Sequence, residues 1–176
     1  QGVSSAASDV YKRQEEDFEY LKYYGHRLTE DLEQNFDCHV HIHRGSAYVM
    51  LQDDCRMGNT FPGNNVLSDI ILLCLAEIRK RIEQKEWNIQ KNEIGIVDTV
   101  SFEQMIRSVR QKYGQGFSKN YREMPDSEFL SAVMAAMELW MFIKWDKASR
   151  QVEIYPAAGK LQGTYPKDFA GGRENE

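Results

Sequence analysis

The sequence has few cysteines, few prolines and no long apolar run. Its three cysteines, Cys38, Cys55 and Cys74, are widely spaced and form no CxxC pair, so neither a disulfide framework nor a zinc ribbon is indicated. The most apolar stretch, residues 66–78, contains two acidic residues and is shorter than the roughly 20 residues of a membrane span. A Ser/His/Asp signature, a Gly-rich phosphate loop and paired catalytic carboxylates are also missing. These absences predict a cytoplasmic protein that is not an enzyme, holds no cofactor and does not contact a membrane.

What is present is the composition of an ordinary globular chain. Of the 176 residues, 41% are hydrophobic and 28% are charged, which suffices for one domain or two small ones with a buried core. The formal net charge is −5, with 22 basic and 27 acidic residues. Nucleic-acid binding would therefore require a local basic patch.

The first fourteen residues differ from the rest of the chain. The stretch SSAASDVYKRQ, residues 4–14, consists mostly of small and polar residues and shows no regular spacing of apolar residues. A segment with strong helical spacing of apolar residues follows it directly. It resembles one reading frame of the transposon-end adaptor used to prepare sequencing libraries. We therefore interpret residues 1–14 as a non-native segment, which predicts that the native N-terminus is missing, with a flexible arm as the alternative.

The next segment predicts a helix followed by a β-hairpin. Apolar residues recur at three- and four-residue spacing over about residues 15–35, which predicts an amphipathic helix. The alternating segment DCHVHIHRGSAYVMLQD is divided by Arg44-Gly45, and a two-residue turn there would pair Ile42 with Ala47. One face of this hairpin would be apolar and buried, and the other would carry three histidines.

Downstream of a linker, the pattern predicts the order helix, strand, helix, helix, strand, strand. Asn64 or Asn65 is expected to cap the first helix, and Ser101 is expected to open the second with a capping box. A polar loop to about Pro125 is expected next, and Asp126 or Ser127 is expected to cap the third helix. The apolar stripe of the third helix is predicted to consist of Phe129, Leu130, Val133, Met134, Met137, Leu139, Trp140 and Met141. The order of these helices and strands is that of a winged helix, in which the last two strands form the wing and the short first strand pairs with it.

A helix followed by a hairpin, as predicted for the earlier segment, is the rear half of the same unit. We therefore expect an α+β, mainly helical fold, a tandem winged-helix protein whose first domain is N-terminally truncated. The expected segments are the non-native residues 1–14, the helix and wing hairpin of the truncated first domain at 15–54, a linker at 55–64, the second winged-helix domain at 65–156, and a C-terminal extension with a polar tail at 157–176.

The motif HVHIH is the first candidate site. Alternate residues of a strand share one face, so His39, His41 and His43 would project together, and neutral imidazoles bind zinc. However, the apolar face is the one to bury, and no Cys pair or closely spaced acidic ligand accompanies the histidines. We therefore predict solvated wing histidines, with a metal site and a pH-sensitive contact as the alternatives.

DNA reading would require basic side chains on the helix that enters a groove. The third helix of the second domain, SEFLSAVMAAMELWMF, contains two Glu and no Lys or Arg, so base-specific readout is not expected. Basic residues gather instead in MIRSVRQKYGQGFSKNYR, which contains no acidic residue. They form either a solvated face, which we favour, or a non-specific contact with the DNA backbone. These residues are Arg107, Arg110, Lys112, Lys119 and Arg122.

The third helix offers apolar surface for a protein partner. Four large apolar residues lie around its end, and they are Trp140, Met141, Phe142 and Trp145. Together they have more apolar surface than one face of a small domain normally buries, and aromatic residues and Met are enriched in interface cores. We therefore assign some of these four residues to the core and the others to a protein interface.

The pattern SEFLSAVMAAMELWMFIKWDKASRQVEIYPAAGKL is a helix that runs into a wing ending in a strand and a proline. Together with the tandem order, it resembles the KITE (MukE/MksE-like) accessory subunits of bacterial SMC–kleisin complexes, which include subunits of Wadjet plasmid-defence systems. The resemblance is one of architecture and includes no diagnostic motif.

The resemblance implies a non-enzymatic homodimer that binds a kleisin beside an SMC-like ATPase, in chromosome condensation or antiplasmid defence. Direct DNA contact stays open, because the chain is acidic. The alternatives are a winged-helix transcriptional regulator, which would need a basic recognition helix, and a metal-binding protein built on the histidine strand.

Overall fold

The computed structural model is α+β and mainly helical, as expected, and its strands form two small antiparallel sheets. The chain divides into a first unit, Gln1–Met57, and a second unit, Gly58–Glu176, and the boundary between them falls within the predicted linker. The structure describes residues 3–43, 47–51, 61–91 and 93–161, with side chains from residue 19 onward.

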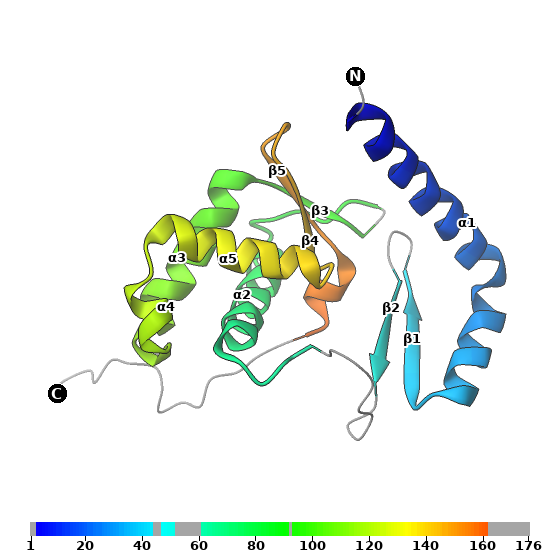
Figure 1. Cartoon of the computed structure of the whole chain (residues 1–176), viewed down its shortest axis with the longest axis horizontal. Helices are drawn as coiled ribbons and strands as arrows, with labels where there is room; N and C mark the ends of the chain where they lie inside the picture. The colour runs from blue at the N-terminus through cyan, green and yellow to red at the C-terminus, as the bar shows by residue number, and fades with distance from the viewer. Residues whose placement is uncertain (1–2, 44–46, 52–60, 92, 162–176) are drawn as a thin grey trace. The chain divides into compact units, whose positions relative to one another are not determined.

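The first unit contains one helix and one two-stranded hairpin (Figure 1). The predicted hairpin register is confirmed, because Ile42 lies opposite Ala47. The predicted turn at Arg44-Gly45 lies outside the described residues. The elements of this unit are α1 (Val3–Asn35), β1 (Cys38–Ile42) and β2 (Ala47–Leu51).

Helix α1 begins well before its predicted start near Glu15. Residues 3–14 contain no Pro or Gly and include Ala, Lys, Arg and Gln, which are good helix formers. A regular spacing of apolar residues reveals a helix only where one face of that helix is buried, so this signal misses a polar helical segment. The helical state of residues 4–14 has no bearing on their resemblance to an adaptor sequence.

Helix α1 and strand β1 approach closely at Gly25. A Cβ atom at this position would lie 2.5 Å from Ile42 Cδ1, so a larger residue would force Ile42 to move. Nearby, Cys38 is buried, and its Sγ lies 3.7 Å from the Leu32 carbonyl oxygen. The hairpin face predicted to be buried is only partly covered, since Ile42 is 38% exposed and Val49 is 50% exposed. One helix and two strands offer too little surface to bury that face completely.

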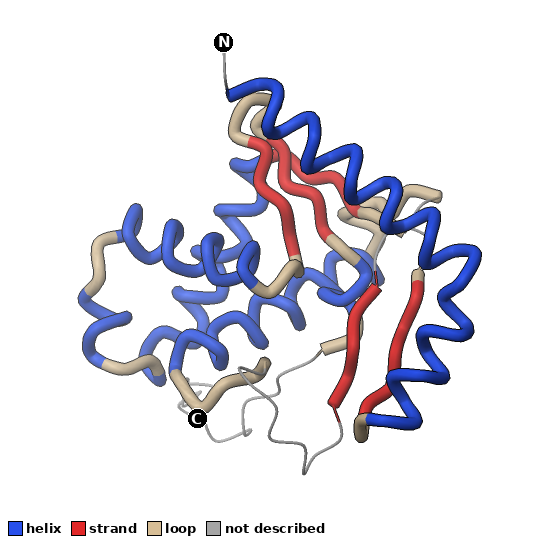
Figure 2. The backbone as a smooth tube through the Cα atoms, turned by 45° about the vertical axis from the view of Figure 1, so that its right-hand side comes forward, coloured by secondary structure: helices blue, strands red, loops and turns tan. Residues whose placement is uncertain are grey.

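The second unit contains the predicted order of helices and strands, with three further short elements. Its sheet has the strand order β3-β5-β4 with antiparallel neighbours, so the short first strand pairs with the wing as predicted (Figure 2). The elements are α2 (Val66–Glu83), β3 (Gly95–Asp98), α3 (Thr99–Tyr113), the 3₁₀ turn η1 (Gly114–Gly116), α4 (Lys119–Glu123), α5 (Asp126–Leu139), β4 (Ile143–Asp146), β5 (Gln151–Ile154) and the 3₁₀ turn η2 (Pro156–Gly159).

The core of the second unit is built from the apolar stripes of α2, α3 and α5 together with the inner face of the sheet. The helical spacing predicted the burial of most residues of these stripes correctly, with exceptions at the end of α5. Among the described residues, no helix combines the length and the apolar character needed to cross a membrane. The largest fully buried side chains include Phe102, Phe129, Ile70, Ile78 and Met137.

The predicted helix caps are confirmed for one helix and wrong for two. Asn65 caps α2, because its Oδ1 accepts a hydrogen bond from the Ser68 amide at 2.9 Å. Helix α3 is capped by Asp98, whose Oδ1 accepts from the Ser101 amide at 2.8 Å, and Ser101 lies within the first turn. Within the described chain, α5 begins at Asp126 without a side-chain cap. Two arginines bind the Asp126 carboxylate instead.

We predict that Asn65→Ala lowers the free energy of unfolding by about 1 kcal/mol, because the Ser68 amide loses its partner. Asn64→Ala is the matched control and is expected to change stability by less than about 0.5 kcal/mol, since Asn64 is exposed and does not cap the helix. Urea unfolding followed by circular dichroism measures both variants. Equal losses in the two would contradict the assignment of Asn65 as the cap.

Candidate functional site

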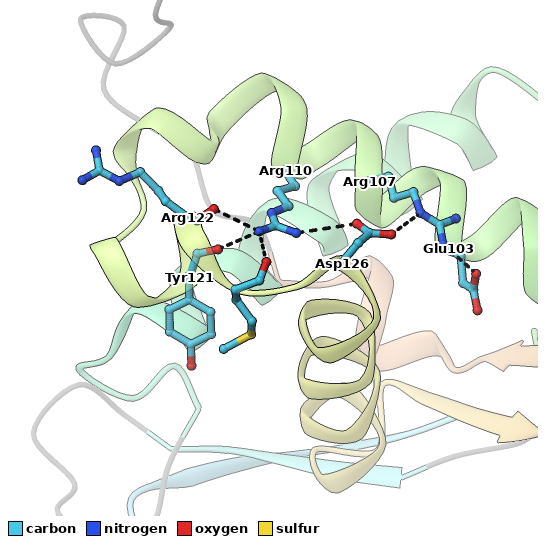
Figure 3. Close-up of polar contacts among 7 residues, drawn as sticks. Glu103, Arg107, Arg110, Tyr121, Arg122 and Asp126 are labelled. Atoms are coloured by element: carbon cyan, nitrogen blue, oxygen red, sulfur yellow. Dashed lines mark hydrogen bonds and ion pairs between the residues drawn. The ribbon is translucent and has the colours of Figure 1, made fainter.

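Arg110 of α3 binds the end of the short helix α4 (Figure 3). Its Nη2 donates to the backbone carbonyls of Tyr121, Arg122 and Met124 at 3.2, 3.1 and 2.5 Å. Its Nη1 lies 3.6 Å from Asp126 Oδ1. One guanidinium therefore satisfies the last carbonyls of α4 and joins them to the start of α5. This contact fixes a helix in a segment that was predicted to be a loop.

Asp126 connects Arg110 to a second arginine. Arg107 Nε donates to Asp126 Oδ2 at 2.8 Å, and Arg107 Nη2 donates to Glu103 Oε2 at 3.2 Å. The hydrogen bond to Asp126 raises the pKa of Arg107 above its ordinary value. The Arg110 guanidinium also lies 4.5 Å from the centroid of the Phe129 ring. Both arginines therefore hold the helices of the second unit together.

The five cations considered either as a solvated face or as a contact with the DNA backbone differ in their contacts. Arg107 and Arg110 are engaged with neighbouring helices, as described above. Lys112, Lys119 and Arg122 are exposed. Lys119 has a glutamate 4.0 Å away along α4, and Arg122 donates to a backbone carbonyl at 3.4 Å. Two of the five cations are therefore tied into the fold, and three are exposed.

The histidines of HVHIH lie on one face of the hairpin with Tyr48, as predicted. The Tyr48 ring centroid lies 5.2 Å from that of His41 and 5.6 Å from that of His43, with near-parallel planes. His39 Nδ1 lies 3.5 Å from Glu33 Oε1. Within the described ranges, no group of three His, Cys, Asp or Glu side chains is placed to hold a metal ion. The histidines form an aromatic row on the hairpin.

Three of the four predicted interface residues are wholly or partly taken up by packing. Phe142 is 3% exposed and belongs to the core, so it cannot contact a partner. Trp140 is half-buried, with its ring centroid 5.6 Å from that of Phe61. Trp145 is also half-buried, and its indole N–H donates to Thr99 Oγ1 at 3.3 Å.

Two apolar side chains are left exposed at the end of α5. Met141 is 58% exposed, as an interface residue requires, and Leu139 is 77% exposed. Leu139 was predicted to belong to the buried stripe, and this was wrong. It follows the buried Met137 by two residues, which places it about 200° around the helix on the solvent side.

Met141 ends α5 in the left-handed conformation, with φ of 54°. The Phe142 amide donates to the Met137 carbonyl at 3.0 Å, and the Met141 amide donates to the Glu138 carbonyl at 3.0 Å. This is the Schellman pattern, in which glycine usually occupies the left-handed position. A residue with a Cβ costs roughly 1–2 kcal/mol there. Lys85, Glu93 and Arg150 also have positive φ, so the conformation alone does not mark a functional position. Met141 differs from these three residues because its side chain is apolar and exposed, which core packing does not explain.

Glu138 is a second locally unfavourable residue at the same helix end. Its carboxylate lies in the last turn of α5, where the helix dipole disfavours negative charge, and the described helix has no basic residue in that turn. Glu138 Oε1 accepts a hydrogen bond from the Trp145 amide at 2.7 Å. We call this region the junction surface. It consists of Glu138, Leu139, Trp140, Met141 and Trp145.

The sequence matches the model of a family described as protein of unknown function (DUF2398) over residues 10–164, and the chain belongs to this family. The matched span includes the junction surface and the arginines of α3. No curated protein matches the chain.

Arg110→Lys is expected to lower the free energy of unfolding by about 2 kcal/mol, because an ammonium cannot reproduce the planar fork that binds several oxygens. Arg122→Lys serves as the control, since Arg122 is exposed, and should remain within about 0.5 kcal/mol of the wild type. Urea unfolding reports both values. Wild-type stability of Arg110→Lys would contradict its role in fixing α4 and α5.

Met141→Gly is expected to raise the free energy of unfolding by about 0.5–1 kcal/mol, because glycine adopts the left-handed conformation without a Cβ clash. Lys85 offers a matched comparison, since it has φ of 61° in the same Schellman arrangement at the end of α2. Lys85→Gly should give a similar gain in thermal or urea unfolding. A loss of stability in Met141→Gly would show that the methionine side chain is needed for packing.

Proposed function

We propose that this chain is a non-enzymatic accessory subunit that binds the kleisin of a bacterial SMC-type complex, in chromosome condensation or plasmid defence. The observation that carries the proposal is the character of α5. In the proposed winged helix, this helix takes the place of the recognition helix, yet it has no Lys or Arg and ends in an exposed apolar surface. Apolar residues with methionine suit a protein partner better than a polyanion.

The second unit supports a winged-helix interpretation. Its order of helices and strands and its β3-β5-β4 sheet agree with the order and pairing that a winged helix requires. The first unit, a helix followed by a hairpin, agrees with the rear half of such a domain. A fold carries many functions, so the functional proposal depends on the junction surface and not on the fold.

The contacts of the basic residues favour a protein partner over sequence-specific DNA reading. Asp126 and Glu128 place negative charge in the first turn of α5, the part that enters a groove in helix-turn-helix readers. Lys112, Lys119 and Arg122 remain for a weak contact with a DNA backbone. This arrangement does not favour the alternative of a transcriptional regulator.

We also propose a homodimer. The first unit exposes large apolar side chains on its helix and its hairpin, including Tyr23, Tyr24, Val49 and Met50. A helix with two strands is marginal as an independent unit, and a second copy would cover part of this surface. Sedimentation equilibrium of the purified chain tests this state.

Leu139→Asp is expected to weaken binding to a purified candidate kleisin by at least about tenfold, because a charge replaces an exposed apolar contact. The variant should fold normally, since Leu139 points to solvent. Ser127→Asp, at the other end of the exposed face of α5, is the matched control. Co-purification and isothermal titration calorimetry compare them with the wild type.

Met141→Gly separates binding from folding in the same experiment. It should bind the kleisin more weakly while its free energy of unfolding rises. Wild-type affinity of both Leu139→Asp and Met141→Gly would refute the junction surface as the interface. A gene neighbourhood without an SMC-like ATPase or a kleisin would contradict the proposed complex.

A further inference from the structure

Each unit joins a helix to the hairpin that follows it through one glutamate. In the first unit, Glu33 Oε1 of α1 accepts a hydrogen bond from the Val40 amide of β1 at 3.0 Å. In the second unit, Glu138 Oε1 of α5 accepts one from the Trp145 amide of β4 at 2.7 Å. Acceptor and donor are seven residues apart in both units, and the donor is the third residue of its strand. We call this the glutamate contact.

The two helices that carry these glutamates are also covered at the same positions. The residues one, four, five and eight positions before each glutamate are buried or half-buried. They are Leu32, Thr29, Leu28 and Gly25 in α1, and Met137, Met134, Val133 and Leu130 in α5. Five positions after each glutamate, the strand begins with a buried residue, Cys38 or Ile143. One helix–hairpin arrangement is therefore used twice, and the glutamate contact belongs to it.

The stability of the helices does not explain the two glutamates. Glu33 and Glu138 lie in the last turns of α1 and α5, where the helix dipole disfavours negative charge. Among the described residues of these two turns, none is basic. What both positions provide is an acceptor within reach of a strand amide. The hydrogen bond between helix and hairpin is thus the contribution that recurs.

In the second unit, the glutamate contact spans the turn that carries the exposed part of the junction surface. Leu139 and Met141 lie between Glu138 and β4, and both are exposed. In the first unit, Phe36 is 44% exposed and follows Glu33 by three residues, as Met141 follows Glu138. A short link between the ends of such a turn restricts the conformations of the residues within it.

We propose that Glu138 is a positioning residue of the junction surface: its contact with the Trp145 amide fixes the wing hairpin to the end of α5 and thereby sets where Leu139 and Met141 meet the partner. Glu33 has the corresponding role for the hairpin of the first unit. The inference rests on the proposed function, because the partner is the kleisin. A surface that is fixed before binding loses less conformational freedom when the partner binds.

Hydrogen exchange followed by NMR tests the contact itself and needs no kleisin. Glu138→Ala should exchange the Trp145 amide about tenfold faster than the wild type, the equivalent of one net hydrogen bond. Glu138→Gln keeps an acceptor oxygen and should restore the protection. Glu128→Ala, on the exposed first turn of α5, controls for the loss of charge. Equal exchange of the Trp145 amide in all four proteins would overturn the proposal.

The first unit allows the same measurement. Glu33→Ala should exchange the Val40 amide faster than the wild type, and Glu33→Gln should restore its protection. Glu30→Ala is the matched control, because Glu30 is an exposed carboxylate of the same helix that pairs with His26. An unchanged Val40 amide in Glu33→Ala would overturn the corresponding role of Glu33.

Isothermal titration calorimetry with a purified candidate kleisin tests the positioning role. Glu138→Ala should bind about threefold to tenfold more weakly than the wild type, and Glu138→Gln should recover the affinity. In a Leu139→Asp background, Glu138→Ala should have little further effect, because the side chain that Glu138 positions is already lost. Independent, additive losses in the double variant would contradict positioning and would indicate that Glu138 contacts the partner directly.

The outcomes separate this inference from the proposed function. Faster exchange of the Trp145 amide in Glu138→Ala, combined with wild-type affinity for the kleisin, would overturn the positioning role and leave the proposed function intact. Absence of kleisin binding by the wild type would overturn the proposed function and, with it, the role of Glu138 in partner binding.

Discussion

The second unit depends on one guanidinium. Arg110 extends from α3 to the terminal carbonyls of α4 and to the carboxylate that begins α5, while its face covers a buried aromatic ring. A single side chain therefore links three helices, and the apolar stripes of α3 and α5 also meet in the core. Because the start of α5 is fixed in this way, the other end of α5 is also fixed, and the junction surface is presented on a rigid element.

The end of α5 departs from local rules three times within four residues. A carboxylate lies where the helix dipole disfavours it, an apolar side chain is exposed, and a methionine adopts a left-handed conformation that suits glycine. Each choice is destabilising or neutral for the isolated unit. Residues that do not suit their local secondary structure are expected at functional sites. Because three of them lie together here, the junction surface differs from scattered surface hydrophobic residues.

The periodic parts of the fold could be predicted from the sequence, and contacts between distant residues could not. The alternation of apolar and polar residues correctly predicted that Ile42 pairs with Ala47 in the hairpin, and helical spacing identified the core residues of α2 and α3. The cap of α3 was placed three residues late, because Asp98 also fitted the preceding strand. The pairing of Arg110 with Asp126 joins residues in different helices, so no local pattern reports it. Leu139 was misplaced because the stripe was extended past the last buried turn.

The central claim is that the end of α5 meets the kleisin directly. A photo-crosslinking amino acid at position 139, introduced into the chain expressed with its neighbouring genes, tests this contact in the assembled complex. The account predicts a cross-link to the kleisin from position 139 and none from position 127, at the other end of the same helix. Cross-linking of position 139 to DNA alone, or a kleisin cross-link from position 127 but not from 139, would contradict it.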